Sequence, residues 1–238
     1  MNIRLHDGPL AELECDAVFV PLVGGAMLGQ EAETLLSNLR ESGEITGKRG
    51  ELTILHEPKH LAASRLIFVG VGKTFDADQA FCMAGQALRA AQKRKFKRLV
   101  FALNDGDLVR AVAEGCVYGG YERPKYKSDD TFSAVDEIII IAPEAEQSEF
   151  DSGIVVGESV NVARRLVDTP ANDLGPEEFA EMTESMGVAA GLEVEVLGES
   201  DLEDLGAGSL LSVAKGSARP PRLVRLAWNP DKVVNDSH

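Results

Sequence analysis

Ile138-Ile139-Ile140-Ile141 is a run of four apolar residues, and Leu66-Ile67-Phe68-Val69 is a second. Neither run alternates with polar residues, as a strand with one solvent-exposed face would. A strand that is apolar on both faces is covered on both faces, as in a three-layer α/β sandwich. These two stretches therefore predict a sheet with helices packed on either side.

Strand-length and helix-length patterns alternate around these two runs. The expected strands are Asp16–Val23, Glu51–Glu57, Arg65–Val71, Arg98–Leu103 and Glu137–Ala142. Between them, apolar residues that recur every three or four positions predict the helices Glu31–Ser42, Asp76–Lys95 and Asp107–Tyr121. Strands that alternate with helices are typical of an α/β fold. We therefore predict a three-layer α/β domain over residues 1–150.

A polar stretch from Pro143 to Gly153 follows this domain, and we place a domain boundary there. The next segment, residues 151–173, is expected to be a linking helix centred on Ile154–Val167. Its expected apolar side consists of Val155, Val156, Val160, Ala163 and Val167.

Residues 174–238 carry a second α/β pattern. A helix is expected to start at Pro176, with Phe179, Met182, Met186 and Ala190 on one face, and to end at Gly191. Ser200–Glu203 has the form of a capping box that starts another helix. The expected strands are Leu192–Val196 and Arg222–Trp228. Two strands are too few for an independent sheet, so we expect this segment to be the incomplete start of a larger domain.

The composition excludes several classes of protein. The 238 residues carry a net charge of −15, which disfavours nucleic acid as a general partner. No apolar run approaches the roughly 20 residues of a membrane span, so no membrane partner is expected. Three cysteines with no C-x-x-C spacing, and no signal peptide at Met1–Asp7, are typical of a cytoplasmic protein. The one basic run, Lys93–Arg98, follows a helical pattern, and cations that complement a helix C-terminus explain it better than a binding patch.

The sequence offers three weak candidates for a chemical site. Gly70–Thr74 contains Gly-Lys-Thr after a strand, but the loop is too short for a phosphate-binding P-loop, and Lys73 with Asp76 is better interpreted as a surface pair than as metal ligands. The glycine-rich stretch Val23–Gly29 could approach an anion with its backbone, although a structural turn is the better interpretation.

The histidines and cysteines form no metal-binding pattern. His56 and His60 have the spacing of a zinc-binding pair on a helix, but Pro58 lies between them, and His6 and His238 stand alone. Cys15, Cys82 and Cys116 are expected to be small buried hydrophobic residues. We therefore name no catalytic, cofactor-binding or metal-binding residue in this chain.

Asn161–Leu174, which reads N-V-A-R-R-L-V-D-T-P-A-N-D-L, resembles the A-R-x-L-V-N-T-P-x-N-x-L-T-P signature of the leucyl aminopeptidase (cytosol aminopeptidase) family. Leu205–Ser217 and Arg219–Leu223 are similar to the L-G-M-G-x-L-L-x-V-x-K-G-S and x-P-P-R-L segments that follow in that family. Asp168 stands where the family usually has Asn, and Gly175 where it has Thr. Gly191–Val196 resembles the family's next strand, and Leu66–Lys73 and Tyr121–Ser128 are similar to weaker marks of its N-terminal domain.

The resemblance implies an N-terminal domain similar to a macro domain, a linking helix and a larger catalytic α/β domain. It also implies a chemistry, in which two divalent metal ions, zinc or manganese, bridge the water that attacks the peptide bond after an N-terminal residue. The family's first metal ligands lie on a V-G-K-G-x-x-F-D-x-G-G motif, which does not occur in these residues. We therefore expect this chain to be the N-terminal portion of a cytosolic leucyl aminopeptidase, without the metal-binding part and inactive alone. A peptide substrate and a homo-oligomer, hexameric in the family, are expected for the full-length enzyme.

Two alternatives stay open at this point. One is a free-standing macro-like module that binds ADP-ribose or a similar nucleotide near Gly24–Gly29. The other is a truncated paralogue that regulates the full enzyme. The reading frame after His238 would separate a piece of a longer protein from a natural short form.

Overall fold

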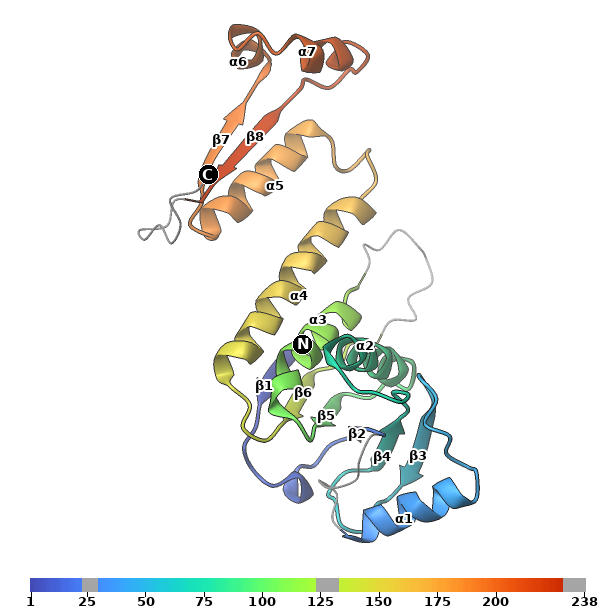
Figure 1. Ribbon diagram of the computed structural model, residues 1–238. Coiled ribbons are helices and arrows are strands. Elements are labelled where there is room, and N and C mark those ends of the chain that lie inside the picture. Colours follow the sequence, from blue (N-terminus) through green and yellow to red (C-terminus); the bar gives the residue numbers. More distant parts are fainter. Residues whose placement is uncertain (23–29, 123–132, 229–238) are drawn as a thin grey trace. The chain divides into compact units, whose positions relative to one another are not determined.

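The computed structural model describes residues 1–22, 30–122 and 133–228 (Figure 1). The chain divides into two compact units, Met1–Arg164 and Arg165–His238, which are described separately below. This division falls near the end of a long helix. The domain limits at residues 150 and 173 that the sequence suggests stay predictions.

The first unit is built around a six-stranded sheet with the order β1-β6-β5-β2-β4-β3. Neighbouring strands are parallel, except that β3 runs antiparallel to β4 at one edge. The strands are β1 (Asn2–Leu5), β2 (Ala17–Pro21), β3 (Leu52–His56), β4 (Arg65–Val69), β5 (Arg98–Ala102) and β6 (Glu137–Ile141). The sequence pattern does not reveal β1, because this edge strand is short, carries the polar residues Asn2 and Arg4, and is only partly buried.

The helices of this unit are α1 (Gln30–Glu41), α2 (Ala77–Lys93), α3 (Val109–Gly119) and α4 (Gln147–Asp168), with short 3-10 turns at Leu10–Glu12 and Gly106–Leu108. Asp76 caps α2, because its carboxylate accepts from the backbone N–H of Gln79 at 3.0 Å and the Gln79 side chain accepts from the Asp76 N–H. None of the described helices is long and apolar enough to cross a membrane.

Alternate residues of the central strands enter two separate cores, as expected for a three-layer sandwich. Phe19, Ile67, Phe101, Ile138 and Ile140 pack with α2 and α3. Val18, Phe68, Val100 and Ile139 pack on the opposite face with Leu36 of α1. Ile138, Ile139 and Ile140 have no exposed surface. The mixed α/β fold with a mainly parallel sheet is therefore confirmed.

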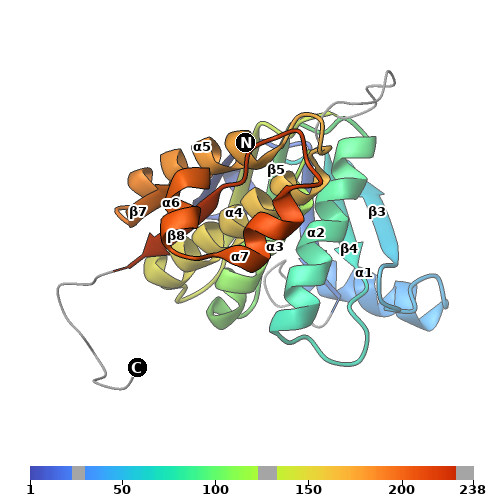
Figure 2. The same ribbon diagram turned by 90° about the horizontal axis from the view of Figure 1, so that it is seen from above.

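Helices α2 and α3 lie side by side and approach closely at glycines (Figure 2). A Cβ atom at Gly115 would lie 2.4 Å from the carbonyl oxygen of Phe81, and one at Gly119 would lie 2.8 Å from the Cα of Gly85. Both distances are shorter than side chains tolerate, so only glycine permits this spacing.

Helix α4 begins at Gln147, so most of the polar stretch expected to be a linker is helical. Its buried residues are Phe150, Gly153 and Gly157. The expected valine side is not the contact face, since Val155 and Val167 are 61% and 84% exposed. The predicted contact face was wrong because it was chosen by side-chain hydrophobicity. Helix α4 instead contacts α3 through glycines, which let the two backbones approach each other.

The second unit contains a two-stranded antiparallel sheet, β7 (Glu193–Leu197) and β8 (Leu223–Ala227). Its helices are α5 (Pro176–Ala189), α6 (Glu199–Asp204) and α7 (Gly208–Ala214). Arg225 of β8 pairs with Glu195 at 2.7 Å and with Glu193 at 3.2 Å on the neighbouring strand. This two-stranded sheet matches the two strands that the sequence predicts.

Two details of this unit differ from expectation. The buried face of α5 consists of Ala180, Thr183 and Gly187, and Phe179 is instead 41% exposed. A Cβ atom at Gly187 would lie 2.6 Å from a methyl group of Val194, so a small residue is required there. In α6 the N-cap is Gly198, whose N–H donates to Asp201 at 2.8 Å, and Ser200 lies inside the helix.

Candidate functional site

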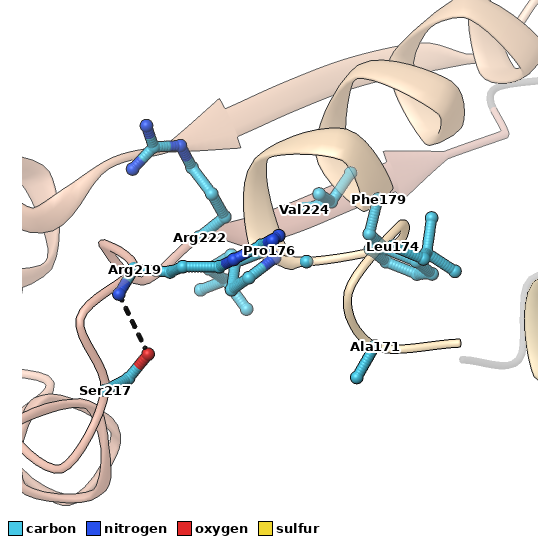
Figure 3. Close-up of a pocket in the computed structure, with 10 residues that line it drawn as sticks. Ala171, Leu174, Pro176, Phe179, Ser217, Arg219, Arg222 and Val224 are labelled. Atoms are coloured by element: carbon cyan, nitrogen blue, oxygen red, sulfur yellow. Dashed lines mark hydrogen bonds between the residues drawn. The ribbon is translucent and has the colours of Figure 1, made fainter. Parts of the chain in front are cut away.

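A cleft in the described part of the second unit has a volume of about 650 Å³. Figure 3 shows that it lies where the segment before α5 meets the segment before β8. These segments belong to the two motifs that carry the family resemblance, so residues about 45 positions apart in the sequence form one cleft. Its lining residues are Ala171, Leu174, Gly175, Pro176, Phe179, Ser217, Arg219, Arg222, Leu223 and Val224.

Glu178 and Arg219 hold the two motifs together. The Glu178 carboxylate accepts from the N–H of Gly175 at 3.0 Å and from Nη1 of Arg219 at 2.9 Å. Nη2 of Arg219 donates to the carbonyl oxygen of Asn172 at 2.9 Å. A hydrogen bond from its own backbone N–H, together with Arg219 and the Gly175 N–H, lowers the pKa of Glu178. One side chain therefore caps α5 and anchors the other motif.

Arg222, the second arginine of the cleft, also pairs with an acidic side chain. Nη2 of Arg222 donates to Glu177 at 2.8 Å, and its Nη1 donates to the carbonyl oxygen of Pro221 at 2.9 Å. Both guanidinium groups thus face acidic residues of the first turn of α5. This arrangement joins segments of the chain, and among the lining residues it presents no nucleophile beside a general base.

Sequence reasoning missed these four charged residues as a set. The sequence does show that Glu177 and Glu178 are acidic residues at a helix N-terminus, where they interact favourably with the helix dipole. Their pairing with Arg219 and Arg222 depends on how the chain folds back, and no spacing rule encodes it. The arginines that flank Pro220-Pro221 in the R-P-P-R segment are the available signal.

The weak candidates have structural roles. Gly70 directly follows β4, where a Cβ atom would meet the carbonyl oxygen of Lys48 at 2.1 Å, and Gly72 has a φ of +94°. Lys73 is exposed, and Asp76 is occupied as the cap of α2. Val23–Gly29 lies outside the described residues.

Three residues of the basic run Lys93–Arg98 make hydrogen bonds or ion pairs within the first unit. Arg94 donates to the carbonyl oxygen of Ala90, and Lys97 to that of Ala134. Arg98 pairs with Glu137, which also accepts from Nε of Arg4 at 2.9 Å.

The histidines are dispersed, with His56 and His60 exposed and His238 outside the described part of the chain. Cys15 and Cys116 are buried, and burial raises the pKa of the Cys15 thiol to about 11. The expectation for Cys82 was wrong, because this residue lies on an exposed position of α2. In the ranges that the structure describes, no three His, Cys, Asp or Glu side chains are grouped so that they could hold a metal ion.

Two family models match the chain in order. The N-terminal domain of the cytosol aminopeptidase family matches residues 18–130, and the catalytic domain of the same family matches residues 161–238. The chain belongs to the cytosol aminopeptidase family.

Two relatives agree with this assignment. A probable cytosol aminopeptidase of Solibacter usitatus is 34% identical over 245 residues, which cover 100% of this chain and 50% of that protein. A probable cytosol aminopeptidase of Rhodococcus jostii is 34% identical over 221 residues, covering 88% of this chain and 43% of the relative. The chain thus spans about half the length of the relatives it matches.

Solved structures show the same architecture. The bottromycin maturation enzyme BotP in complex with Mn superposes with a TM-score of 0.75 at 28% identity, covering 91% of this chain and 46% of that one. A variant of tomato leucine aminopeptidase superposes with a TM-score of 0.79 over 98% of this chain and 52% of that one. At 20% identity, the tomato enzyme supports the fold alone.

Proposed function

We propose that the whole protein to which these residues belong is a two-metal aminopeptidase that removes N-terminal residues from peptides. Residues 1–238 would supply its N-terminal, macro-like domain, the linking helix and the first part of its catalytic domain. The observation that carries this proposal is the match of both domain models in the family's order.

We further propose that the 238 residues alone are inactive and hold no metal tightly. The described residues offer no metal-ligand cluster, and a two-metal hydrolase needs its metals as Lewis acid and as the source of an activated water. On this proposal the metal ligands lie outside residues 1–238, and no step of the reaction is assigned to a residue of this chain. Its contribution would be structural, through the joined motifs at Arg219 and Glu178.

The expected setting follows the family resemblance. We propose that the protein acts in the cytoplasm as a homo-oligomer, with the hexamer of the family as the expected assembly, and without nucleic-acid or membrane partners. Size measurement of the 238-residue chain by light scattering tests whether these residues suffice for assembly.

The inactivity of the chain is tested by elemental analysis after dialysis and by an assay with a chromogenic leucine amide. With or without added manganese, we expect no stoichiometric metal and no hydrolysis. Metal-dependent turnover that follows the protein peak through repurification would contradict the proposal. Binding of ADP-ribose at one molecule per chain would instead favour the free-standing macro-like module.

The aminopeptidase assignment needs a chain that continues beyond residue 238. A chimera of residues 1–238 with the remaining half of the Solibacter usitatus relative offers one. We expect it to bind two manganese ions and to hydrolyse the leucine amide. A folded, metal-loaded chimera without hydrolytic activity, tested beside the intact relative, would contradict the assignment.

A further inference from the structure

Helix α4 contacts α3 through a stripe in which residues recur at intervals of four, four and three. The stripe consists of Gly153, Gly157, Asn161 and Arg164. A Cβ atom at Gly153 would lie 2.3 Å from the carbonyl oxygen of Arg110, and one at Gly157 would lie 2.7 Å from Cβ of Val117. The glycines therefore place the backbone of α4 directly against α3.

Farther along the stripe, small residues give way to hydrogen-bond donors. Nδ2 of Asn161 donates to the carbonyl oxygen of Val117 at 2.8 Å, and Nη1 of Arg164 donates to that of Tyr118 at 2.9 Å. These carbonyls belong to the last turn of α3, where the regular intrahelical donors run out. That of Tyr118 also accepts from the N–H of Tyr121 at the longer distance of 3.4 Å. Helix α3 has no basic residue in its own last turn. The Arg164 charge at this position complements the α3 dipole from a different helix.

The Arg164 guanidinium is also held from both sides. It lies 4.1 Å from the centre of the Tyr118 ring and 4.1 Å from that of the Tyr121 ring. Its Nη1 also donates to Oδ1 of Asn161 at 2.9 Å, so the two capping side chains orient each other. A planar guanidinium can stack and donate at once, which a lysine ammonium cannot do.

We propose that Asn161 and Arg164 form a latch that caps α3 and ends the fixed part of α4. The hinge between the two units then lies in residues 165–175. Arg164 is the last residue of the first unit. Beyond it, Arg165 and Val167 are exposed and Pro170 stops the helix. The device is conformational: with the latch closed, the linking helix is a rigid extension of the first unit, and with the latch open, the last turn of α3 and the second half of α4 loosen together.

Hydrogen exchange of the full 238-residue chain, followed by mass spectrometry, tests the latch. In the unmodified chain we expect peptides from 165–175 to exchange about tenfold faster than peptides from 154–164. Arg164→Met should raise exchange about tenfold in both 154–164 and 115–121. Arg164→Lys should give an intermediate increase, because it keeps the charge and loses the stacking.

Arg165→Met is the matched control, since it removes the same charge one position along the same helix, and it should leave both segments unchanged. Asn161→Ala removes one capping bond and should raise exchange in the same two segments, which keeps the test decisive if Arg164→Met does not fold. Three results would overturn the latch: uniform exchange from 154 to 175, equal effects of the Arg164 and Arg165 variants, or protection of residues 115–121 that none of these changes affects.

Discussion

At the scale of single residues, one buried hydroxyl group in α5 lowers the stability of the fold. Oγ1 of Thr183 is buried and has no hydrogen-bond partner among the described residues. Its residue is 9% exposed and belongs to the small-residue face of the helix. A buried polar group without a partner loses its hydrogen bonds to water and gains nothing in return.

Thr183→Val should therefore raise the free energy of unfolding of the second unit by about 1 kcal/mol, because it keeps the shape and removes the hydroxyl. Denaturant unfolding monitored by the fluorescence of Trp228 would measure the change. Thr183→Ser, which keeps the hydroxyl and deletes the methyl group, should be destabilising. A gain for the serine variant, or a loss for the valine variant, would show that the hydroxyl is not the unfavourable group.

A second prediction at this scale concerns Glu137. The hydrogen bond from Arg4, followed by the charges of Arg98 and Arg4, lowers the pKa of this carboxyl. A carboxyl whose pKa is lowered in the folded protein stabilises the fold above its unfolded pKa of about 4.3, and this contribution is lost as the pH falls through the lowered value.

Glu137→Gln should therefore cost about 0.5 kcal/mol at neutral pH, a modest effect because the ion pairs are partly exposed. The penalty should be smaller near pH 3 than at neutral pH, since the stabilisation from the lowered pKa shrinks as the pH falls below the unfolded pKa of about 4.3. Urea unfolding at both pH values measures this. An equal penalty at the two pH values would mean that the carboxylate charge does not contribute.

At the scale of elements, the helices pack through their smallest residues. Gly85 and Gly115 set the spacing of α2 and α3, Gly153 and Gly157 seat α4, and Gly187 seats α5. The sequence analysis placed the elements well, because apolar runs and periodicity reveal a strand or a helix. It chose the wrong face for α4 and α5, because glycine scores as neutral in an apolar pattern although it allows the closest approach. The start of α4 was missed because Gln147–Ser152 is polar, while only Phe150 there is buried.

Gly115→Ala tests this packing. The added Cβ would lie 2.4 Å from the Phe81 carbonyl and 3.0 Å from Cβ of Ala84, so α2 and α3 must separate. We expect a loss of about 1–3 kcal/mol in thermal or denaturant unfolding, despite the better helix propensity of alanine. Gly208→Ala, where nothing lies within 4 Å of the new methyl group, is the control and should be close to neutral. Similar losses for both variants would contradict the packing argument.

At the scale of the whole molecule, the two units differ in how many hydrophobic residues they bury. Nearly all of the described buried hydrophobic residues lie in the first unit, and Ala180 and Leu202 are the only ones described after Arg164. The sequence predicted the two motifs that line the cleft, because their residue order is specific. It could not predict that Arg219 reaches Glu178 and Asn172, since that contact brings together residues more than 40 positions apart once the chain has folded. The absence of named catalytic residues stays a prediction.

Limited proteolysis should therefore degrade the second unit first. We expect early cuts in residues 169–174 and a resistant fragment that ends near Asp168. Early cleavage in 147–153, which the sequence pattern alone suggests, is not expected, since this segment is helical with Phe150 and Gly153 buried. Mass spectrometry of the digest identifies the fragments. A resistant fragment from Leu174 to Trp228, with the first half digested, would show that the second unit is the more stable one and would contradict this prediction.

The capping of α3 by α4 decides where the first domain can be cut for separate expression. A polypeptide that stops at residue 150 follows the compositional boundary, yet it removes the donors to the Val117 and Tyr118 carbonyls of α3. It also exposes the surface of α3 near Arg110 and Val117, against which the α4 glycines pack. A polypeptide that continues to Asp168 keeps Asn161 and Arg164 in place. A boundary chosen by composition would therefore remove Asn161 and Arg164, which cap α3. The shorter polypeptide should be the more prone to aggregate.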